Sequence, residues 1–333
     1  MKNNTTIMNT DKFQNLLSKV YKIDRISEII KHGEKHSIVN AFCVNGALSE
    51  NKIITMPFSF LPRSLGYSDD IYNMHHLVNI AQSMGDGFHV EYKSFHDIGD
   101  SIYIKEKKVI KSEELINSSL ALQKSYEHQQ SLFSKSLRQT IRTCERRAIE
   151  SKVEFVIASD INQIKSFYLM LVKMFRDKHH TISQPFEIFE AIYNDFVPKK
   201  MANFYLAIRD NKVIAGVVVF SYNSNWTYMW GASDQEYAKL SLNTLLVNRV
   251  IKDAVKNGAV SLDFGPSNIK NKSLIKFKDK WGCKQEEVFL YCWNRTEKNI
   301  GESRLYSIIR KIIPYVPLYI LKKIPKYVAP ILV

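Results

Sequence analysis

Asp263 is the first residue whose position suggests chemistry. It lies in a short apolar run, residues 260–264, that is typical of a strand. Open α/β sheets bind ligands beyond the carboxyl ends of their strands, where a carboxylate could hold or deprotonate an amine. The carboxylate could instead cap the turn that follows, through the amides of Ser267 or Asn268. Both interpretations stay open, and Asn268 is a further candidate for contacting an acceptor.

Lys278 is the second candidate, within the run Phe277-Lys278-Asp279-Lys280-Trp281-Gly282. An ammonium group can stabilise an oxyanion that develops during a reaction. The alternative is an ordinary lysine on a helix surface, because four further lysines lie close in sequence: Lys270, Lys272, Lys276 and Lys280.

Two histidines and two aromatic residues complete the candidates for substrate binding. His179 and His180 are adjacent, so their side chains diverge and suit a shared metal ion poorly. One of them could act as a base in a substrate loop, or both could be solvated. Tyr228 and Trp230 stand two apart in an expected strand, so we expect them on one face, either in the core or as a platform for a sugar or acyl group.

Several catalytic classes lack their sequence signatures here. No GxSxG, HExxH, Walker or GxGxxG pattern occurs, which removes support for hydrolase, zinc protease, P-loop and Rossmann interpretations. No His/Cys/Glu spacing completes a zinc set, so we expect no metal. The four cysteines stand far apart and no signal peptide precedes them: Cys43, Cys144, Cys283 and Cys292. We therefore expect reduced thiols in a cytoplasmic protein.

The composition is that of a folded, strongly basic protein. The chain has 333 residues, 45% of them hydrophobic and 24% charged, which excludes disordered and low-complexity classes. The net charge of +14 favours polyanionic partners such as nucleic acid, anionic lipid or phosphate-bearing substrates. No run of about 18 apolar residues exists, so we expect no membrane span.

The first 150 residues divide into a mixed part and a basic part. Helical spacing of apolar residues runs over 12–31, and strand-like runs cover 38–43 and 53–60. Residues 114–150 lack Gly and Pro, which predicts a long polar helix. Three of its arginines fall four apart on one face, which is either solvated or in contact with an anion: Arg138, Arg142 and Arg146.

The second half has a clearer order of elements. We expect helices over 161–175, 240–255 and 273–281, and strands over 153–157, 204–208, 213–220, 226–230, 260–264 and 288–293. In this order, an antiparallel meander ends in a strand, a helix and a parallel strand. The start of that helix should point into the gap where the two parallel strands diverge. Its backbone amides and dipole would form an anion site there.

Residues 203–293 resemble a known family. The segments FYLAIRDNKVIAGVVVFSY, TYMWGASDQEYAKLSLNTLLVNRVIKDAVKNGAVSLDFGPSN and SLIKFKDKWGCK are similar to the GNAT-like acyltransferase domain of the FemA/FemB/FemX type. The upstream run SKSLRQTIRTCERRAIESKVEF is similar to that family's basic linker helix and following strand. In these enzymes the lysine matched by Lys278 contacts substrate phosphate and the reacting carbonyl.

The resemblance implies an α/β (α+β) fold of two tandem GNAT-like domains, with mixed central sheets flanked by helices. The expected divisions are a degenerate N-terminal GNAT-like domain at 1–112, a basic helical linker at 113–152, the C-terminal acyltransferase domain at 153–298, and a basic amphipathic tail at 299–333.

The stretch before the long helix departs from acetyl-CoA enzymes of this superfamily. They carry a glycine-rich loop there, whereas residues 235–243 contain no glycine. Side chains with Cβ atoms would crowd a nest of amides around pyrophosphate. The departure resembles the FemA/FemB branch, whose donor is an aminoacyl-tRNA. The expected donor-binding positions are Gly231 after the strand and Ser241, Leu242 and Asn243 at the helix start.

The tail from residue 302 is basic, aromatic and broken by prolines. Its composition suits the headgroup layer of an anionic membrane, although it could instead pack back onto the protein. We therefore expect residues 302–333 to contact an anionic membrane peripherally, at the inner membrane face.

Three functions fit these observations. The first is an N-acyltransferase that uses acyl-CoA, such as acetyl-CoA, and acts on an amine of a cell-envelope polysaccharide or peptidoglycan precursor, an amino sugar or a lipid-linked precursor. The second is a FemA/FemB-like peptidyltransferase that binds tRNA as aminoacyl-tRNA. The third is a non-catalytic component of envelope assembly at the membrane. Direct transfer, without a covalent enzyme intermediate, is expected in the first two.

Overall fold

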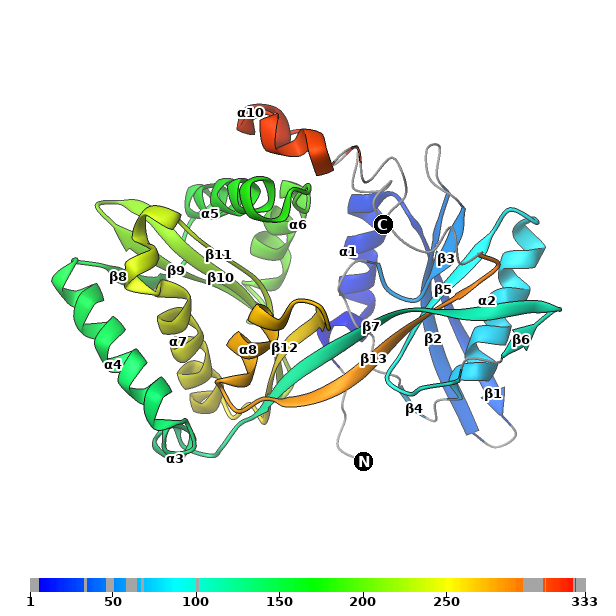
Figure 1. The fold of residues 1–333 in the computed structure, drawn as a ribbon, viewed down its shortest axis with the longest axis horizontal. Coiled ribbons are helices and arrows are strands. Elements are labelled where there is room, and N and C mark those ends of the chain that lie inside the picture. Colours follow the sequence, from blue (N-terminus) through cyan, green and yellow to red (C-terminus); the bar gives the residue numbers. More distant parts are fainter. Residues whose placement is uncertain are drawn as a thin grey trace.

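The computed structural model describes residues 6–32, 35–45, 51–57, 65–66, 69–99, 102–295, 308, 310–325 and 327. One mixed sheet of 13 strands runs through these residues, with helices packed against it (Figure 1). Its strands follow the order β1-β2-β3-β5-β13-β7-β12-β11-β10-β9-β8, with β4 paired to β2 and β6 to β7.

The N-terminal half contains a hairpin, a short strand, a helix and a parallel strand. Its elements are η1 (Ile7–Asn9), α1 (Asp11–Tyr21), β1 (Asp24–His32), β2 (Lys35–Val44), β3 (Lys52–Ile54), β4 (Leu65–Gly66), α2 (Asp70–Met84), β5 (His89–Ser94), β6 (Tyr103–Ile104) and β7 (Lys107–Ala121). β3 pairs with β5 in parallel, as strands joined through a helix do.

The C-terminal half repeats that arrangement at greater length. Its elements are α3 (Tyr126–Ser131), α4 (Lys135–Glu150), β8 (Glu154–Ile157), α5 (Ile161–Met174), η2 (Phe175–His179), α6 (Phe186–Ala191), η3 (Ile192–Phe196), β9 (Ala202–Arg209), β10 (Lys212–Tyr222), β11 (Asn225–Ser233), η4 (Gln235–Leu240), α7 (Leu242–Lys256), β12 (Ser261–Asn268), α8 (Lys272–Asp279), β13 (Lys284–Trp293), η6 (Ile313–Tyr315) and α10 (Leu318–Leu321). β11 and β12 form the second parallel pair. The predicted tandem α/β architecture is confirmed.

β7 and β13 join the two halves. β13 comes last in sequence, yet it lies between β5 of the first half and β7, and both neighbours pair with it antiparallel. Figure 1 shows the two long strands running from one lobe to the other. The β7 assignment also shows that the expected helical linker is wrong for residues 113–121, which are strand. Pairing on both edges overrides the helix-favouring composition there. The division into domains at the expected positions stays a prediction.

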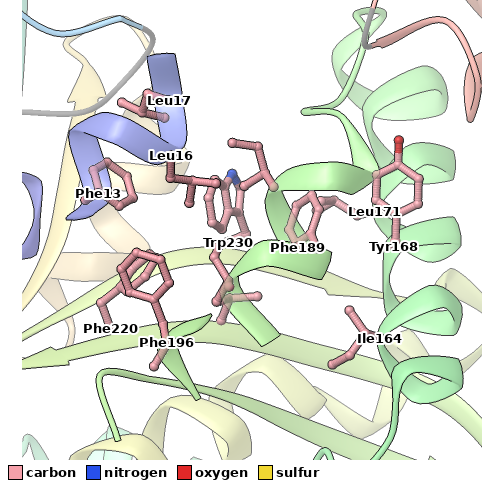
Figure 2. Close-up of a cluster of buried hydrophobic side chains, with 14 of the residues drawn as sticks. Phe13, Leu16, Leu17, Ile164, Tyr168, Leu171, Phe189, Phe196, Phe220 and Trp230 are labelled. Atoms are coloured by element: carbon pink, nitrogen blue, oxygen red, sulfur yellow. The ribbon is translucent and has the colours of Figure 1, made fainter. Parts of the chain in front are cut away.

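The first helix packs against the C-terminal half. Side chains of α1 meet those of α6, η3, β10 and β11 in one buried cluster, as Figure 2 shows: Phe13, Leu16, Leu17, Phe189, Phe196, Phe220 and Trp230. Phe13 meets Phe220 edge to face at 5.4 Å between ring centroids. The expected helix over 12–31 is right only as far as Tyr21, because Lys22 takes a left-handed conformation and β1 follows. The short segment 6–9 is thereby held close to β11 and β12.

Candidate functional site

β11 and β12 form the fork that the order of elements predicts. They pair over three positions only, and Thr227 opposite Asp263 is the last of them. Beyond it β11 stays with β10 as far as Ser233, while β12 pairs with β7 as far as Asn268. The two strands are therefore not joined along their length, and the predicted wedge is confirmed.

A β-bulge at Met229 corrects the expected placement of the two aromatic residues. Val218 faces Trp230 and the next residue, Val219, faces Tyr228, so Met229 is the extra residue. The bulge reverses the alternation of side chains. Trp230 packs into the cluster with α1, α5 and α6, whereas Tyr228 packs on the α7 face. They cannot form one platform.

Tyr228 fills part of the wedge on the α7 face. Its ring stacks on Phe264 of β12 at 5.8 Å between centroids. Burial raises the pKa of its phenol, so the group stays neutral. A Cβ on Gly231 would collide with the Tyr228 hydroxyl, which explains the glycine at that position. Gly231 thus shapes the fork through Tyr228.

The opposite face of the fork holds a small pocket of about 90 Å³. Asp263 and Thr227 line it, and the N-terminal segment contributes Thr6 and Met8. The other lining residues are Asn117, Tyr228, Met229, Phe264, Gly265 and Pro266. Residues 250 positions apart in sequence therefore meet where the two strands separate.

Asp263 faces this pocket and also supports the turn after it. Its Oδ1 accepts a hydrogen bond from the Gly265 amide at 2.7 Å, not from Ser267 or Asn268. The two sequence-based interpretations of Asp263 are thus compatible: one carboxylate oxygen supports the backbone, and the side chain still lines the pocket.

Asn117 is a site residue that sequence reasoning missed. Its fully buried side chain reaches from β7, with the amide nitrogen 3.5 Å from Oδ2 of Asp263. With the amide oxygen and nitrogen exchanged, the nitrogen lies 3.2 Å from Oδ1 and 3.2 Å from the Gly265 carbonyl. Both orientations place a donor beside the carboxylate. The sequence predicts a helix over 114–150, and that prediction did not point to Asn117. Only the strand β7 brings residue 117 to this pocket.

Lys278 lies beneath the same turn. It is 4% exposed, and its Nζ donates to the carbonyls of Gly265 at 2.7 Å and Pro266 at 3.3 Å. Burial lowers the pKa of this ammonium to about 8, and the charge of Asp263 partly opposes the change. Lys278 does not line the pocket. It fastens the backbone that carries Asp263, and its contact with the reacting carbonyl stays a prediction.

The start of α7 has the geometry of an anion site. Ser241 takes a left-handed conformation (φ 49°, ψ 44°), and no side chain caps the helix. A left-handed residue after a right-handed one can turn neighbouring backbone amides toward one point, although the Ser241 amide itself donates to the Ala238 carbonyl at 3.0 Å. Asn243 is the second residue of α7 and lies in its first turn. Its Oδ1 is buried without a hydrogen-bond partner among the described residues. Leu242 is a core residue, so only its backbone is available.

Lys280 adds a positive charge beside this helix start. Its Nζ donates to Oγ1 of Thr244 at 3.3 Å and lies over the Phe277 ring. On the other side, Arg147 of α4 reaches the Lys239 carbonyl in η4 at 3.2 Å. Arg142 and Arg146 of the predicted basic face are exposed.

Arg138, the third arginine of that face, is engaged. It donates to the carbonyls of Ser131 at 2.9 Å and Phe133 at 2.6 Å, so it closes α3. Arg146 forms an ion pair with Glu150 at 3.7 Å, so two of the three arginines of that face are engaged within the protein.

Three candidate residues lie outside the pocket. His179 and His180 are exposed at the end of η2, with the His179 ring 5.4 Å from Phe175. Asn268 accepts a hydrogen bond from the Lys270 amide at 2.9 Å and shapes a turn. The structure does not bring these residues to Asp263, and their substrate-binding roles stay predictions.

Neither a cluster of metal-ligating side chains nor a membrane-spanning helix occurs among the described residues. In the part of the chain that the structure describes, no group of three or more His, Cys, Asp or Glu side chains could hold a metal ion. No helix among these residues is long and apolar enough to cross a membrane.

Comparisons with known proteins agree with this geometry. Residues 135–273 match the family described as "Acetyltransferase (GNAT) domain". The solved structure of FemX is similar, with a TM-score of 0.58 at 14% identity over 92% of this chain and 94% of that one. No curated protein sequence matches significantly.

Two further solved structures share the fold. The C-terminal domain of a putative lysylphosphatidylglycerol synthetase from Agrobacterium fabrum has a TM-score of 0.52 at 13% identity, covering 92% of this chain and 93% of that one. A tandem GNAT protein of the clavulanic acid pathway reaches 0.51 at 10% identity, covering 87% and 96%. At such identities the likeness concerns the fold. It confirms the resemblance to GNAT-like proteins of the FemX type.

Proposed function

We propose, from the premise that this chain carries a GNAT acyltransferase fold of the FemX type, that it transfers an acyl group directly to an amine at the fork between β11 and β12. One observation carries the proposal. The two strands separate after Thr227 and Asp263, with a carboxylate at the fork and an uncapped helix start on the element that connects them. A fork of this kind can receive a donor on one side and an acceptor on the other.

The acceptor amine is assigned to the pocket of Asp263. The carboxylate accepts a proton from the incoming ammonium, which leaves a neutral nitrogen with its lone pair directed at the acyl carbonyl. Asn117 donates toward the carboxylate and keeps it in place. The new C–N bond forms as the carbonyl becomes an oxyanion. Its collapse breaks the bond to the carrier, whose oxygen or sulfur leaves and takes up a proton.

The donor's anionic carrier is assigned to the start of α7. Its positive end, the left-handed Ser241 and the Lys280 ammonium together favour a phosphate. Ser241 adopts a left-handed conformation without being glycine, at a cost of about 1–2 kcal/mol. Because it does so, the missing glycines do not preclude acyl-CoA, and we propose acyl-CoA as donor and an envelope amino sugar as acceptor.

Aminoacyl-tRNA is the second candidate donor. Exposed Arg142 and Arg146 lie on α4, which packs against η4 and α7 at the donor side. A polyanion extending from the fork would meet this basic face, and the net charge of +14 agrees. A chain that binds either carrier without transferring would instead have the non-catalytic role in envelope assembly.

The test compares donors on the full-length chain. Radiolabelled acetyl-CoA and aminoacyl-tRNA are each incubated with amino-sugar and peptidoglycan precursors, and label transfer to the amine is measured. Transfer from acetyl-CoA supports the first donor, and transfer from aminoacyl-tRNA supports the second. Binding without transfer from either would contradict the enzymatic proposal.

Asp263→Asn tests the site itself. We expect turnover to fall about 10²–10⁴-fold, the usual range for a lost general base, with little change in donor affinity. Asp279→Asn is the matched control, because that exposed carboxylate on α8 accepts only from Gln285. Near-normal turnover of the Asp263 variant would remove the assignment.

A further inference from the structure

The described part of the C-terminal tail, residues 308, 310–325 and 327, is anchored to the protein at two points. Ile313 of η6 and Leu321 of α10 are buried in the core cluster that contains α5 and α6 side chains. α10 packs against α5, and η6 packs against η2. Figure 1 shows α10 on the outside of the molecule beside α5. The tail thus packs back onto the protein, one of the two outcomes that the sequence allows.

The side chains that do not anchor the tail form an exposed surface of aromatic, aliphatic and basic groups. Tyr315 is 84% exposed, Tyr319 64% and Ile312 54%. Tyr319 of α10 and the two lysines that follow the helix, Lys322 and Lys323, share the side opposite Leu321 because they are three and four residues apart. We call the following residues the tail surface: Arg310, Lys311, Ile312, Tyr315, Tyr319, Lys322 and Lys323.

The charge of this surface is uniform. The described tail residues include four cations and no acid. η2, which packs against η6, carries exposed Lys178, and its Arg176 and Asp177 form an ion pair with each other. Large exposed apolar side chains beside clustered cations indicate a partner that is both apolar and anionic.

We propose that the tail surface docks the protein on an anionic lipid bilayer. Tyrosine rings lie at the headgroup level, aliphatic side chains enter the acyl boundary, and lysines meet lipid phosphates. The bases of a nucleic acid could stack on the tyrosine rings, but a nucleic acid offers no apolar region for exposed Ile308 and Ile312. Because buried Ile313 and Leu321 already hold the tail surface on the outside of the protein, binding to a membrane would cost little conformational entropy. This inference does not depend on the proposed acyl transfer.

The experiment measures sedimentation of the full-length protein with vesicles. One set contains phosphatidylcholine alone and the other adds a quarter of phosphatidylglycerol. We expect binding to the anionic set only, weakened by 0.5 M salt. Lys322→Gln/Lys323→Gln should weaken it about 30-fold, since each surface cation contributes about 1 kcal/mol. Tyr315→Ser/Tyr319→Ser should weaken it about tenfold.

Matched controls separate the tail surface from general basicity. Lys31→Gln/Lys108→Gln removes two exposed lysines elsewhere, and Tyr72→Ser/Tyr103→Ser removes two exposed tyrosines. Equal losses in the control and tail variants would overturn the proposal, as would equal binding to both vesicle sets. The same variants are titrated with labelled tRNA, and a tail effect on tRNA but not on vesicles would also overturn it. Thermal melting verifies that every variant folds.

Discussion

Each half of the chain contains a parallel strand pair of three positions, and the two pairs differ in their chemical surroundings. In the C-terminal half, β11 and β12 pair over three positions that end at Thr227 and Asp263. In the N-terminal half, β3 and β5 pair over three positions that end at Ile54 and Glu91. A carboxylate therefore follows the same geometry in both halves, and the helix between the strands is α7 in one half and α2 in the other.

The N-terminal ends of α2 and α7 differ in whether the protein itself places acidic side chains there. Asp69 caps α2 by accepting from the Tyr72 amide at 3.0 Å, and Asp70 follows in the first turn. α7 has no acidic residue in its first turn and no capping side chain. The positive end of α2 is thus complemented by the protein, whereas that of α7 remains available to an anion.

The carboxylates at the ends of the two strand pairs also differ in their surroundings. Glu91 is buried with Lys52 at 3.2 Å, His89 at 3.3 Å and Arg295 at 3.4 Å. Burial acts to raise the pKa of Glu91, but hydrogen bonds and charges from His89 and Lys52 hold it at about 2. Asp263 lines a pocket instead. The first half therefore closes the end of its strand pair with buried ion pairs, whereas the second half has a pocket at that place.

Glu91→Gln should give the largest effect, and on stability alone. Removing one partner of a buried ionic cluster costs about 3–5 kcal/mol. Because the folded pKa lies below 4.5, the stabilisation is complete above pH 4.5 and is lost as the pH falls toward 2. Urea unfolding of the two proteins from pH 7 to pH 3 measures it. Transfer activity per folded molecule should stay normal, and a specific loss of turnover would break the comparison.

Lys278→Met should change how the stability of the protein depends on pH, because it removes the buried ammonium of the second half. Burial lowers its folded pKa to about 8 from 10.5, so the folded state binds fewer protons than the unfolded one between these values. Wild-type stability should therefore rise relative to the variant by about 3 kcal/mol as the pH increases from 8 to 10.5. Lys276→Met, on the exposed side of α8, is the control and should show no such dependence.

Asn243→Asp would give α7 the first-turn carboxylate that α2 already has. The added charge repels an anionic carrier, and we expect donor affinity to fall about 30-fold, or about 2 kcal/mol. Stability should hold or increase slightly, because an acid suits a helix start. Equilibrium binding measures the effect, with Asn257→Asp at the far end of α7 as control. Unchanged donor affinity would show that the donor lies elsewhere.

The smallest expected effect is on stability, from substitutions at the residues that precede α2 and α7. Asp69→Ala removes a capping bond and should cost about 1 kcal/mol of stability. Ser241→Ala removes a side chain that caps nothing and should cost a few tenths. Thermal unfolding of the two variants decides the point. A large loss for Ser241→Ala would mean that its hydroxyl supports the fold and that the α7 start is not reserved for a ligand.

Local patterns predicted the second half well. Strands at 204–208, 213–220 and 226–230 and the helix at 240–255 match β9, β10, β11 and α7 within a few residues. Their apolar runs are long and their turns carry clear signals, so local preference and tertiary packing agree. The order strand–helix–strand then required a parallel pair and a fork, and Asp263 was found at its end.

The same reasoning failed where partners distant in sequence decide the structure. Residues 113–121 carry helix-favouring charges but are strand because β12 and β13 pair with them. The bulge at Met229 moved Trp230 to the other face, which no periodicity revealed. Asn117 became a site residue for that same reason: only the sheet brings it to Asp263.

The sequence by itself determined the composition of the fork: an apolar strand ending in Asp263, a helix without a glycine-rich start, and a strongly basic surface. Those features depend on neighbours close in the chain. The tertiary structure decided that Lys278 supports the backbone and that Thr6 and Met8 wall the pocket. It also decided that Glu91 is held in buried ion pairs while Asp263 lines a pocket. Burial and ion pairing arise only when distant segments meet, so no local pattern encodes them.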